Sequence, residues 1–256
     1  MTQPLKVELA TPVTLLVLIG GGEFSFGETR EIDEFLVGRM PRKTIAFLPT
    51  ASGSPEYALH LGKYFKQIDA DLETINVPIY RGRDNRRQKN LNQILSAGMI
   101  YVGGGVTNNL LDTLRESPAE MAMRDAAANG AVVAAIGAGA ACFGTHTRDM
   151  RSSASALPAL GWLRKTVIET GFDASSDTML RRLMSLPDAN VGIGIPPGTA
   201  VAVNGDGTTS VLGSGKIAVF KKGSAGRLLW WVTPEVPSSR SWIRNNRNRP
   251  RSPSRS

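Results

Sequence analysis

The chain has 256 residues, of which 41% are hydrophobic and 20% charged, which supports a sizeable core and excludes wholesale disorder. The single cysteine, Cys142, excludes an internal disulfide framework and any multi-cysteine zinc site, and two histidines argue against a histidine-rich metal site. We therefore expect no resident metal or cofactor. The formal charge of +8 includes six arginines that follow Glu235, so residues 1–235 carry only +2 and their charge says little about their ligand.

No stretch of the sequence approaches the roughly 20 consecutive apolar residues that a membrane span needs. The apolar run at 13–19 is too short for the core of a usual signal peptide, and the glycines after it form no cleavage pattern. The sequence therefore predicts a cytoplasmic protein without a membrane span.

The first 136 residues alternate continuous apolar runs, which predict buried strands, with apolar residues at helical spacing. The predicted strands are 13–19, 44–48, 72–77, 99–102 and 131–136. The predicted helices are 28–39, 55–68, 108–115 and 119–128, and 81–89 is predicted to be a basic loop. Strands and helices that alternate in this way predict a parallel sheet with helices on both faces.

From Val167 onward the pattern changes to short strands with glycine-rich turns, predicted at 191–195, 199–203, 210–212 and 216–220. We expect them to extend the same sheet as mixed or antiparallel strands. The predicted fold class is thus a three-layer α/β domain over 13–235, with a mostly parallel sheet and short C-terminal strands added.

Both ends of the chain are predicted to lie outside that domain. Residues 1–12 read as an irregular arm, and residues 236–256 as a disordered tail rich in arginine and serine. The tail has two interpretations. It either keeps the protein soluble, or it makes weak nonspecific contacts with nucleic acid or an anionic surface.

Glycines follow three of the predicted strands, at 20–22, 103–105 and 137–139. Ligands of an open parallel sheet bind at the carboxyl ends of its strands, where glycine permits a tight turn or a close backbone approach. The segment 134–140 reads Ala-Ala-Ile-Gly-Ala-Gly-Ala and predicts a strand, a sharp turn and a helix. That is the geometry of a nucleophile elbow, in which the next backbone N–H points at an oxyanion.

These motifs resemble those of the dipeptidase E and cyanophycinase family of serine peptidases. That family carries Gly-x-Ser-Ala-Gly-Ala at the elbow, Gly-Gly-Asn-Thr or Gly-Gly-Asp-Gln at the position of 104–107, and Gly-Ile-Gly-Ile-Asp-Glu-x-Thr-Ala at the position of 192–200. The resemblance covers roughly residues 13–222. It implies a flavodoxin-like, class I glutamine amidotransferase-like fold and hydrolysis of aspartyl or related peptides.

The sequence departs from the family at the residues that would do the chemistry. Gly137 stands at the position of the nucleophilic serine. The family stretch Asp-x-His-Phe corresponds to 169–172, so Gly171 stands at the position of the histidine. Further departures are Val106 for Asn or Asp, Ser175 and Asp177 for arginines, and Pro196 and Pro197 for the acidic pair. Glycine can neither attack a carbonyl nor accept a proton, so we expect the serine mechanism to be lost.

Other side chains near the elbow are the candidates for a relocated mechanism. Thr107 and Thr170 carry hydroxyl groups but have no adjacent base in the sequence. Cys142 is expected to be a buried structural thiol in the helix after the elbow, and His146 is expected to be structural.

The backbone of the elbow would remain able to bind an anion. The N–H groups of Gly105 and Ala138 would form a small nest for a carboxylate. We therefore predict a ligand site for a small acidic molecule or peptide end, in which Glu169 orients the ligand. Its predicted residues are Gly104, Gly105, Thr107, Gly137, Ala138 and Glu169. A nucleotide site at 137–142 is the weaker interpretation, because Cys142 replaces the last glycine of Gly-x-Gly-x-x-Gly.

The leading hypothesis is a pseudoenzyme of this family that binds a small acidic ligand or peptide, or regulates a partner. It would act as a homo-oligomer or as the oligomeric partner of an active relative. Two alternatives stay open. One is an active hydrolase of aspartyl or cyanophycin-like peptides with relocated catalytic groups, and the other is an interaction module that works through its basic tail.

Overall fold

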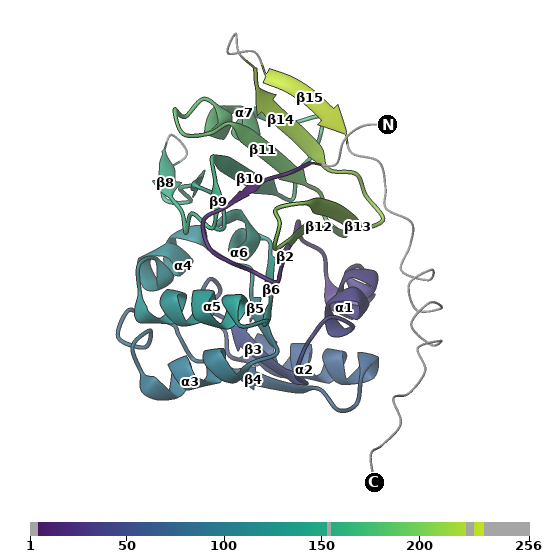
Figure 1. Ribbon diagram of the computed structural model, residues 1–256, viewed down its shortest axis with the longest axis vertical. Helices are drawn as coiled ribbons and strands as arrows, with labels where there is room; N and C mark the ends of the chain where they lie inside the picture. Colours follow the sequence, from purple (N-terminus) through teal and green to yellow (C-terminus); the bar gives the residue numbers. More distant parts are fainter. Residues whose placement is uncertain (1–4, 153–154, 224–227, 233–256) are drawn as a thin grey trace.

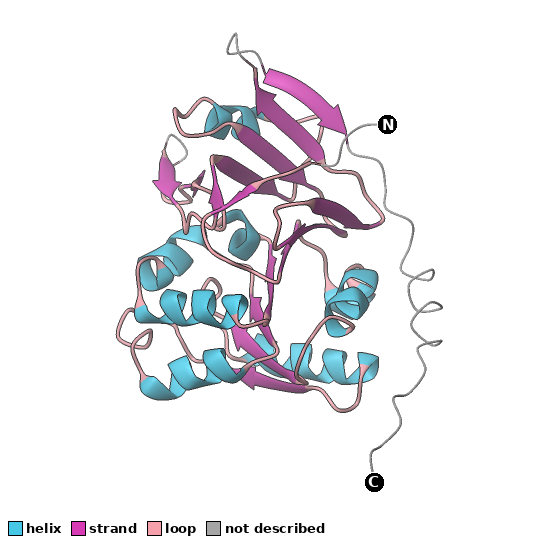
Figure 2. Ribbon diagram, viewed as in Figure 1, coloured by secondary structure: helices cyan, strands magenta, loops and turns pink. Residues whose placement is uncertain are grey.

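The computed structural model describes residues 5–152, 155–223 and 228–232. Its main sheet has seven strands in the order β13-β12-β2-β6-β5-β3-β4 (Figure 2). The five strands from β2 to β4 are parallel, and β12 is antiparallel to both of its neighbours. The strands are β2 (Leu15–Ile19), β3 (Thr44–Leu48), β4 (Glu73–Asn76), β5 (Met99–Val102), β6 (Val132–Ile136), β12 (Thr199–Asn204) and β13 (Thr209–Gly213).

Helices cover both faces of this sheet (Figure 1). One face carries α1 (Arg30–Val37) and α2 (Glu56–Ile68), and the other carries α3 (Gln88–Ser96), α4 (Thr107–Leu114) and α5 (Pro118–Ala128). Successive residues of a strand point to opposite faces, so each strand feeds two cores. In β2, Leu16 and Leu18 join the core under α3–α5, while Val17 and Ile19 join the core under α1 and α2. The predicted three-layer fold class is confirmed.

A second sheet lies beyond one end of the first, in the order β10-β11-β14-β15 (Figure 1). It consists of β10 (Thr166–Thr170), β11 (Val191–Ile195), β14 (Ala218–Lys222) and β15 (Leu228–Val232), and α7 (Thr178–Met184) packs on it. The expectation that 191–195 and 216–220 extend the main sheet is therefore wrong, whereas 199–203 and 210–212 do extend it.

Glycines in β11 let this second sheet pack closely. A Cβ at Gly194 would lie 2.5 Å from the Phe172 ring, and one at Gly192 would lie 2.8 Å from the Met184 side chain. The glycines thus make room for α7 and for the segment that precedes it.

Several short elements complete the described part. Residues predicted as an irregular arm include β1 (Glu8–Leu9), which pairs with β9 (Leu163–Arg164). Helix α3 begins inside the predicted basic loop, at Gln88. The remaining short elements are η1 (Phe24–Phe26), α6 (Ala138–Ala141), β7 (His146–Arg148) and β8 (Ala156–Pro158). None of the described helices is long and apolar enough to cross a membrane. The predicted tail at 236–256 lies outside the described residues.

Candidate active site

The turn between β6 and α6 has the backbone of a nucleophile elbow. Gly137 adopts φ 55° and ψ −125°, a conformation that L side chains rarely adopt and that active sites retain as strain. Its N–H donates to the carbonyl of Ile19 over 2.9 Å. A Cβ added to Gly137 would meet nothing closer than the Cα of Gly104, at 4.0 Å. The absence of a serine is therefore not a consequence of crowding.

Gly171 lies next to this elbow although 33 residues separate the two in sequence. Its N–H donates to the carbonyl of Gly20 over 2.7 Å, and Gly137 uses the carbonyl of the preceding residue, Ile19. The positions predicted for nucleophile and base are thus anchored to consecutive carbonyls at the end of β2. A Cβ added to Gly171, whose φ is 64°, would meet nothing within 4 Å.

The 103–105 loop packs tightly against the elbow. A Cβ at Gly139 would lie 2.7 Å from the carbonyl oxygen of Gly103, and a Cβ at Gly104 would lie 3.3 Å from that of Ile136. Gly105 has φ 143°, and its Cβ would lie 2.5 Å from the backbone of Ala51. The contacts of Gly103, Gly104 and Gly139 hold the 103–105 loop against the elbow, and Gly105 packs against the segment that contains Ala51.

A pocket of about 230 Å³ opens beside the elbow. Of the predicted site residues, Gly105, Thr107, Ala138, Glu169 and Thr170 line it, while Gly104 and Gly137 lie next to these lining residues along the chain. The rest of the lining is mainly apolar, with one cation: Ala141, Thr147, Arg148, Met150, Ile168, Met179 and Leu183.

Glu169 is the acidic group of this pocket. Its Oε2 is buried and has no hydrogen-bond partner among the residues that the structure describes. Burial raises the pKa of the carboxyl to about 7, against the opposing effects of a hydrogen bond from the Leu180 backbone and the charge of Arg148. The negative charge of Asp177 adds to the rise in pKa. A half-buried carboxyl with a free oxygen is a ready acceptor for a ligand N–H group.

The comparisons with known proteins agree with this geometry. Residues 16–211 match the sequence pattern of peptidase family S51. The chain belongs to this family. It is 33% identical over 155 residues to the uncharacterized peptidase YgaJ of Bacillus subtilis (strain 168), over 58% of this chain and 65% of that protein. The chain thus spans slightly less than two thirds of that relative's length.

Two solved structures share the fold. A peptidase from an acI-B1 actinobacterium aligns with a TM-score of 0.68 at 23% identity, over 90% of this chain and 98% of the other. A peptidase E protein from Listeria monocytogenes EGD-e aligns with a TM-score of 0.53 at 16% identity, over 79% and 100%. The resemblance to the dipeptidase E and cyanophycinase family is confirmed.

Within this family S51 chain, the residues considered as substitutes are poorly placed for nucleophilic catalysis. Cys142 is fully buried, which raises its pKa far above the range of a reactive thiol. Thr107 is buried and donates its hydroxyl to the carbonyl of Arg148 over 2.9 Å. In the described part of the chain, neither these two groups nor Thr170 is hydrogen-bonded to a histidine or a carboxylate. His146 is half-buried, and its Nδ1 has no partner.

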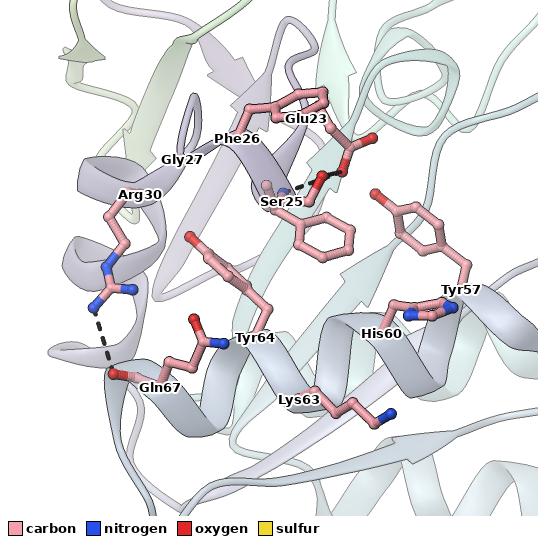
Figure 3. A pocket seen from close by; sticks show the side chains of 11 residues that line it. Glu23, Ser25, Phe26, Gly27, Arg30, Tyr57, His60, Lys63, Tyr64 and Gln67 are labelled. Atoms are coloured by element: carbon pink, nitrogen blue, oxygen red, sulfur yellow. Dashed lines mark hydrogen bonds between the residues drawn. The ribbon is translucent and has the colours of Figure 1, made fainter.

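A second and larger cleft, of about 780 Å³, lies on the other face of the sheet, between η1 and α2 (Figure 3). Sequence reasoning missed it, although Tyr57, His60, Lys63 and Gln67 recur at helical spacing. Its remaining lining residues are Glu23, Phe24, Ser25, Phe26, Gly27, Arg30 and Tyr64. Within 5–152, 155–223 and 228–232, no group of three or more His, Cys, Asp or Glu could hold a metal ion.

Proposed function

We propose that this family S51 protein lacks serine-peptidase activity and binds a small acidic molecule or peptide end in the elbow pocket. The observation that carries the proposal is the pairing of Gly137 and Gly171 at the end of β2. Gly137 has the backbone of a nucleophile elbow, but position 137 carries no hydroxyl to attack and position 171 no imidazole to accept its proton. Hydrolysis by relocated groups gains no support from the surroundings of Thr107, Cys142 or Thr170.

The lining of the pocket supports a ligand that carries both an acidic group and an N–H donor. Gly105 and Ala138 supply backbone N–H groups, and Arg148 supplies a positive charge, which together suit a carboxylate. Glu169 supplies a carboxyl oxygen without a partner, which suits an amino group or an amide N–H. A volume of about 230 Å³ accommodates a molecule of about the size of a dipeptide.

The test measures binding and hydrolysis in the same samples. Aspartyl-leucine is titrated into the full-length protein by calorimetry, and free leucine is then assayed after prolonged incubation at high protein concentration. We expect saturable heat and a raised melting temperature without release of leucine. Alanyl-leucine, which lacks the acidic side chain, is the control ligand and should bind at least about tenfold more weakly.

Two outcomes would contradict the proposal. Neither heat nor a thermal shift with aspartyl-leucine would remove the binding function. Release of leucine that persists after repurification, and that disappears in Thr107→Val or Thr170→Val, would establish relocated catalysis instead.

A further inference from the structure

The second cleft is a groove that runs along one side of α2. Tyr57, His60, Lys63 and Gln67 follow one another at intervals of three or four residues, so they form a stripe along the helix (Figure 3). Ten residues of helix rise through roughly 15 Å. The opposite wall is η1. The cleft lies between these two walls as a groove.

Half of the polar groups in this groove already have partners. The Tyr64 hydroxyl donates to Oδ2 of the buried Asp33 over 2.8 Å. Arg30 pairs with Glu34 over 2.6 Å and also donates to the carbonyl of Gln67 over 3.5 Å. The Glu23 carboxylate accepts hydrogen bonds from the backbone N–H and the hydroxyl of Ser25.

The stripe on α2 is different. Within the described residues, the Tyr57 hydroxyl, the His60 imidazole and the Lys63 ammonium have neither a hydrogen bond nor an ion pair to another side chain or carbonyl. All three can donate hydrogen bonds, and Lys63 carries a positive charge. A partner that accepts hydrogen bonds and carries negative charge therefore complements this wall.

The groove also offers aromatic surface. The Phe24 ring lies edge-on to Tyr57, with ring centroids 5.3 Å apart, and 5.1 Å from the ring of Tyr64. Phe26, at the rim of the groove, is 84% exposed. A large exposed phenylalanine beside an aromatic wall is a typical contact for a bulky apolar side chain of a partner.

We propose that this groove docks an extended peptide segment of a partner protein, one that alternates acidic with bulky apolar side chains. The acidic side chains would face Lys63 and His60, and the apolar ones would pack on Phe26 and Tyr57. A strand rises about 3.3 Å per residue, so roughly five residues fill the 15 Å length. The arginine-rich C-terminus of this chain, with six arginines and no acid after Glu235, has the wrong charge to be the occupant.

The test uses full-length protein and two fluorescein-labelled probe peptides. Asp-Leu-Asp-Phe-Asp-Leu-Asp is expected to bind saturably in a fluorescence anisotropy titration. Lys-Leu-Lys-Phe-Lys-Leu-Lys, which has the same apolar residues and the opposite charge, is expected to show no saturable binding.

Matched variants then locate the binding. Lys63→Glu should weaken the acidic probe at least about tenfold, while Lys66→Glu should change its affinity less than about twofold. Lys66 is the control because it is exposed on the same helix and does not line the groove. Phe26→Ala should also weaken binding about tenfold, with Leu59→Ala as the control, since Leu59 is 62% exposed and lies outside the groove.

Three results would overturn the proposal. One is the absence of saturable binding by the acidic probe. Another is an equal loss of affinity in Lys63→Glu and Lys66→Glu, which would indicate general attraction by surface charge. The third is a dimer in light scattering that Phe26→Ala converts to a monomer without any peptide binding, which would make a second copy of this chain the occupant. All four substitutions are at exposed positions, so unchanged melting temperatures are expected and exclude misfolding.

Discussion

The elbow pocket and the α2 groove lie on opposite faces of the same sheet, and different parts of the chain form their binding groups. At the elbow the backbone is specialised, and glycines occupy the two positions predicted for a nucleophile and a base, Gly137 and Gly171. Along α2 the backbone is an ordinary helix, and within the described residues the Tyr57 hydroxyl, the His60 imidazole and the Lys63 ammonium have no hydrogen bond or ion pair. The glycines of the elbow and of the 103–105 loop pack against neighbouring backbone, so the fold itself needs this backbone form. His60 and Lys63, by contrast, are exposed on the surface of a helix.

The strongest test of this view is a substitution in the 103–105 loop that packs beside the elbow. Gly105→Ala would place a Cβ 2.5 Å from the Ala51 backbone at φ 143°, so both overlap and strain oppose folding. We expect a loss of about 4 kcal/mol in the free energy of unfolding, measured by urea denaturation. Gly130→Ala is the matched control, because Gly130 also has a positive φ of 96° but would have nothing within 4 Å of its Cβ.

The Gly130→Ala control should cost only about 1 kcal/mol, from strain alone. Equal losses in the two variants would mean that the close contact between Gly105 and Ala51 contributes nothing, and that Gly105 is free to move away from Ala51.

The next largest effect is expected at Asp33 of α1, which accepts a hydrogen bond from Tyr64 in the lining of the α2 groove. Asp33 is 1% exposed, and its Oδ2 accepts hydrogen bonds from the hydroxyls of Thr29 and Tyr64, while its Oδ1 has no partner in the described part of the chain. Burial raises its pKa from 3.8 to about 6. Between about pH 4 and pH 6 the folded protein keeps a proton on Asp33 that the unfolded chain releases. The free energy of unfolding therefore falls as the pH rises through this range, and it stays lower above it.

Replacement of Asp33 by Asn removes this titration. As the pH rises from 4 to 7, the free energy of unfolding of the unmodified protein should fall by about 3 kcal/mol more than that of Asp33→Asn. Urea denaturation at half-unit pH steps measures the difference. Parallel pH profiles for the two proteins would show that Asp33 titrates alike in the folded and unfolded states.

The local signals in the sequence predicted most of the main sheet and the elbow. The apolar runs at 44–48 and 99–102 became β3 and β5 with the same bounds. Helix α3 was missed because Gln88–Ser96 contains only three large apolar residues, Leu91, Ile94 and Leu95, among polar ones. The second sheet was missed because a strand such as β11 does not encode in its own residues which sheet it joins.

The same reasoning explains why only one of the two clefts was predicted. The elbow is encoded in a few consecutive residues around Gly137, whose spacing alone suggests a sharp turn. The groove is formed by η1 and α2, and 29 residues lie between Phe26 at the end of η1 and Glu56 at the start of α2. On its own, the stripe from Tyr57 to Gln67 has the pattern of a solvent-facing helix surface.

Restoration of the two missing side chains tests whether the elbow backbone is still competent. A Cβ meets open space at Gly137 and at Gly171, so Gly137→Ser with Gly171→His should fold at a cost of about 1 kcal/mol of backbone strain at each positive φ. We expect the double variant to hydrolyse aspartyl-leucine at least about tenfold faster than either single variant, because the serine needs the adjacent base. A folded double variant with no activity above the single variants would show that the elbow no longer stabilises an oxyanion.

The smallest expected effect is a pH dependence of ligand affinity that depends on Glu169 in the elbow pocket and not on Lys63 in the α2 groove. In the free protein the pKa of Glu169 is raised to about 7, and the neighbouring charges are those of Arg148 and Asp177. A ligand amino group favours the ionised carboxylate, so the affinity for aspartyl-leucine should rise a few-fold from pH 6 to pH 7.5. Calorimetry at the two pH values measures the change.

Glu169→Gln should bind aspartyl-leucine more weakly and lose the pH dependence, whereas Lys63→Glu, in the groove on the other face, should retain it. The same pH dependence in Glu169→Gln would assign the titration to another group and remove Glu169 from ligand recognition.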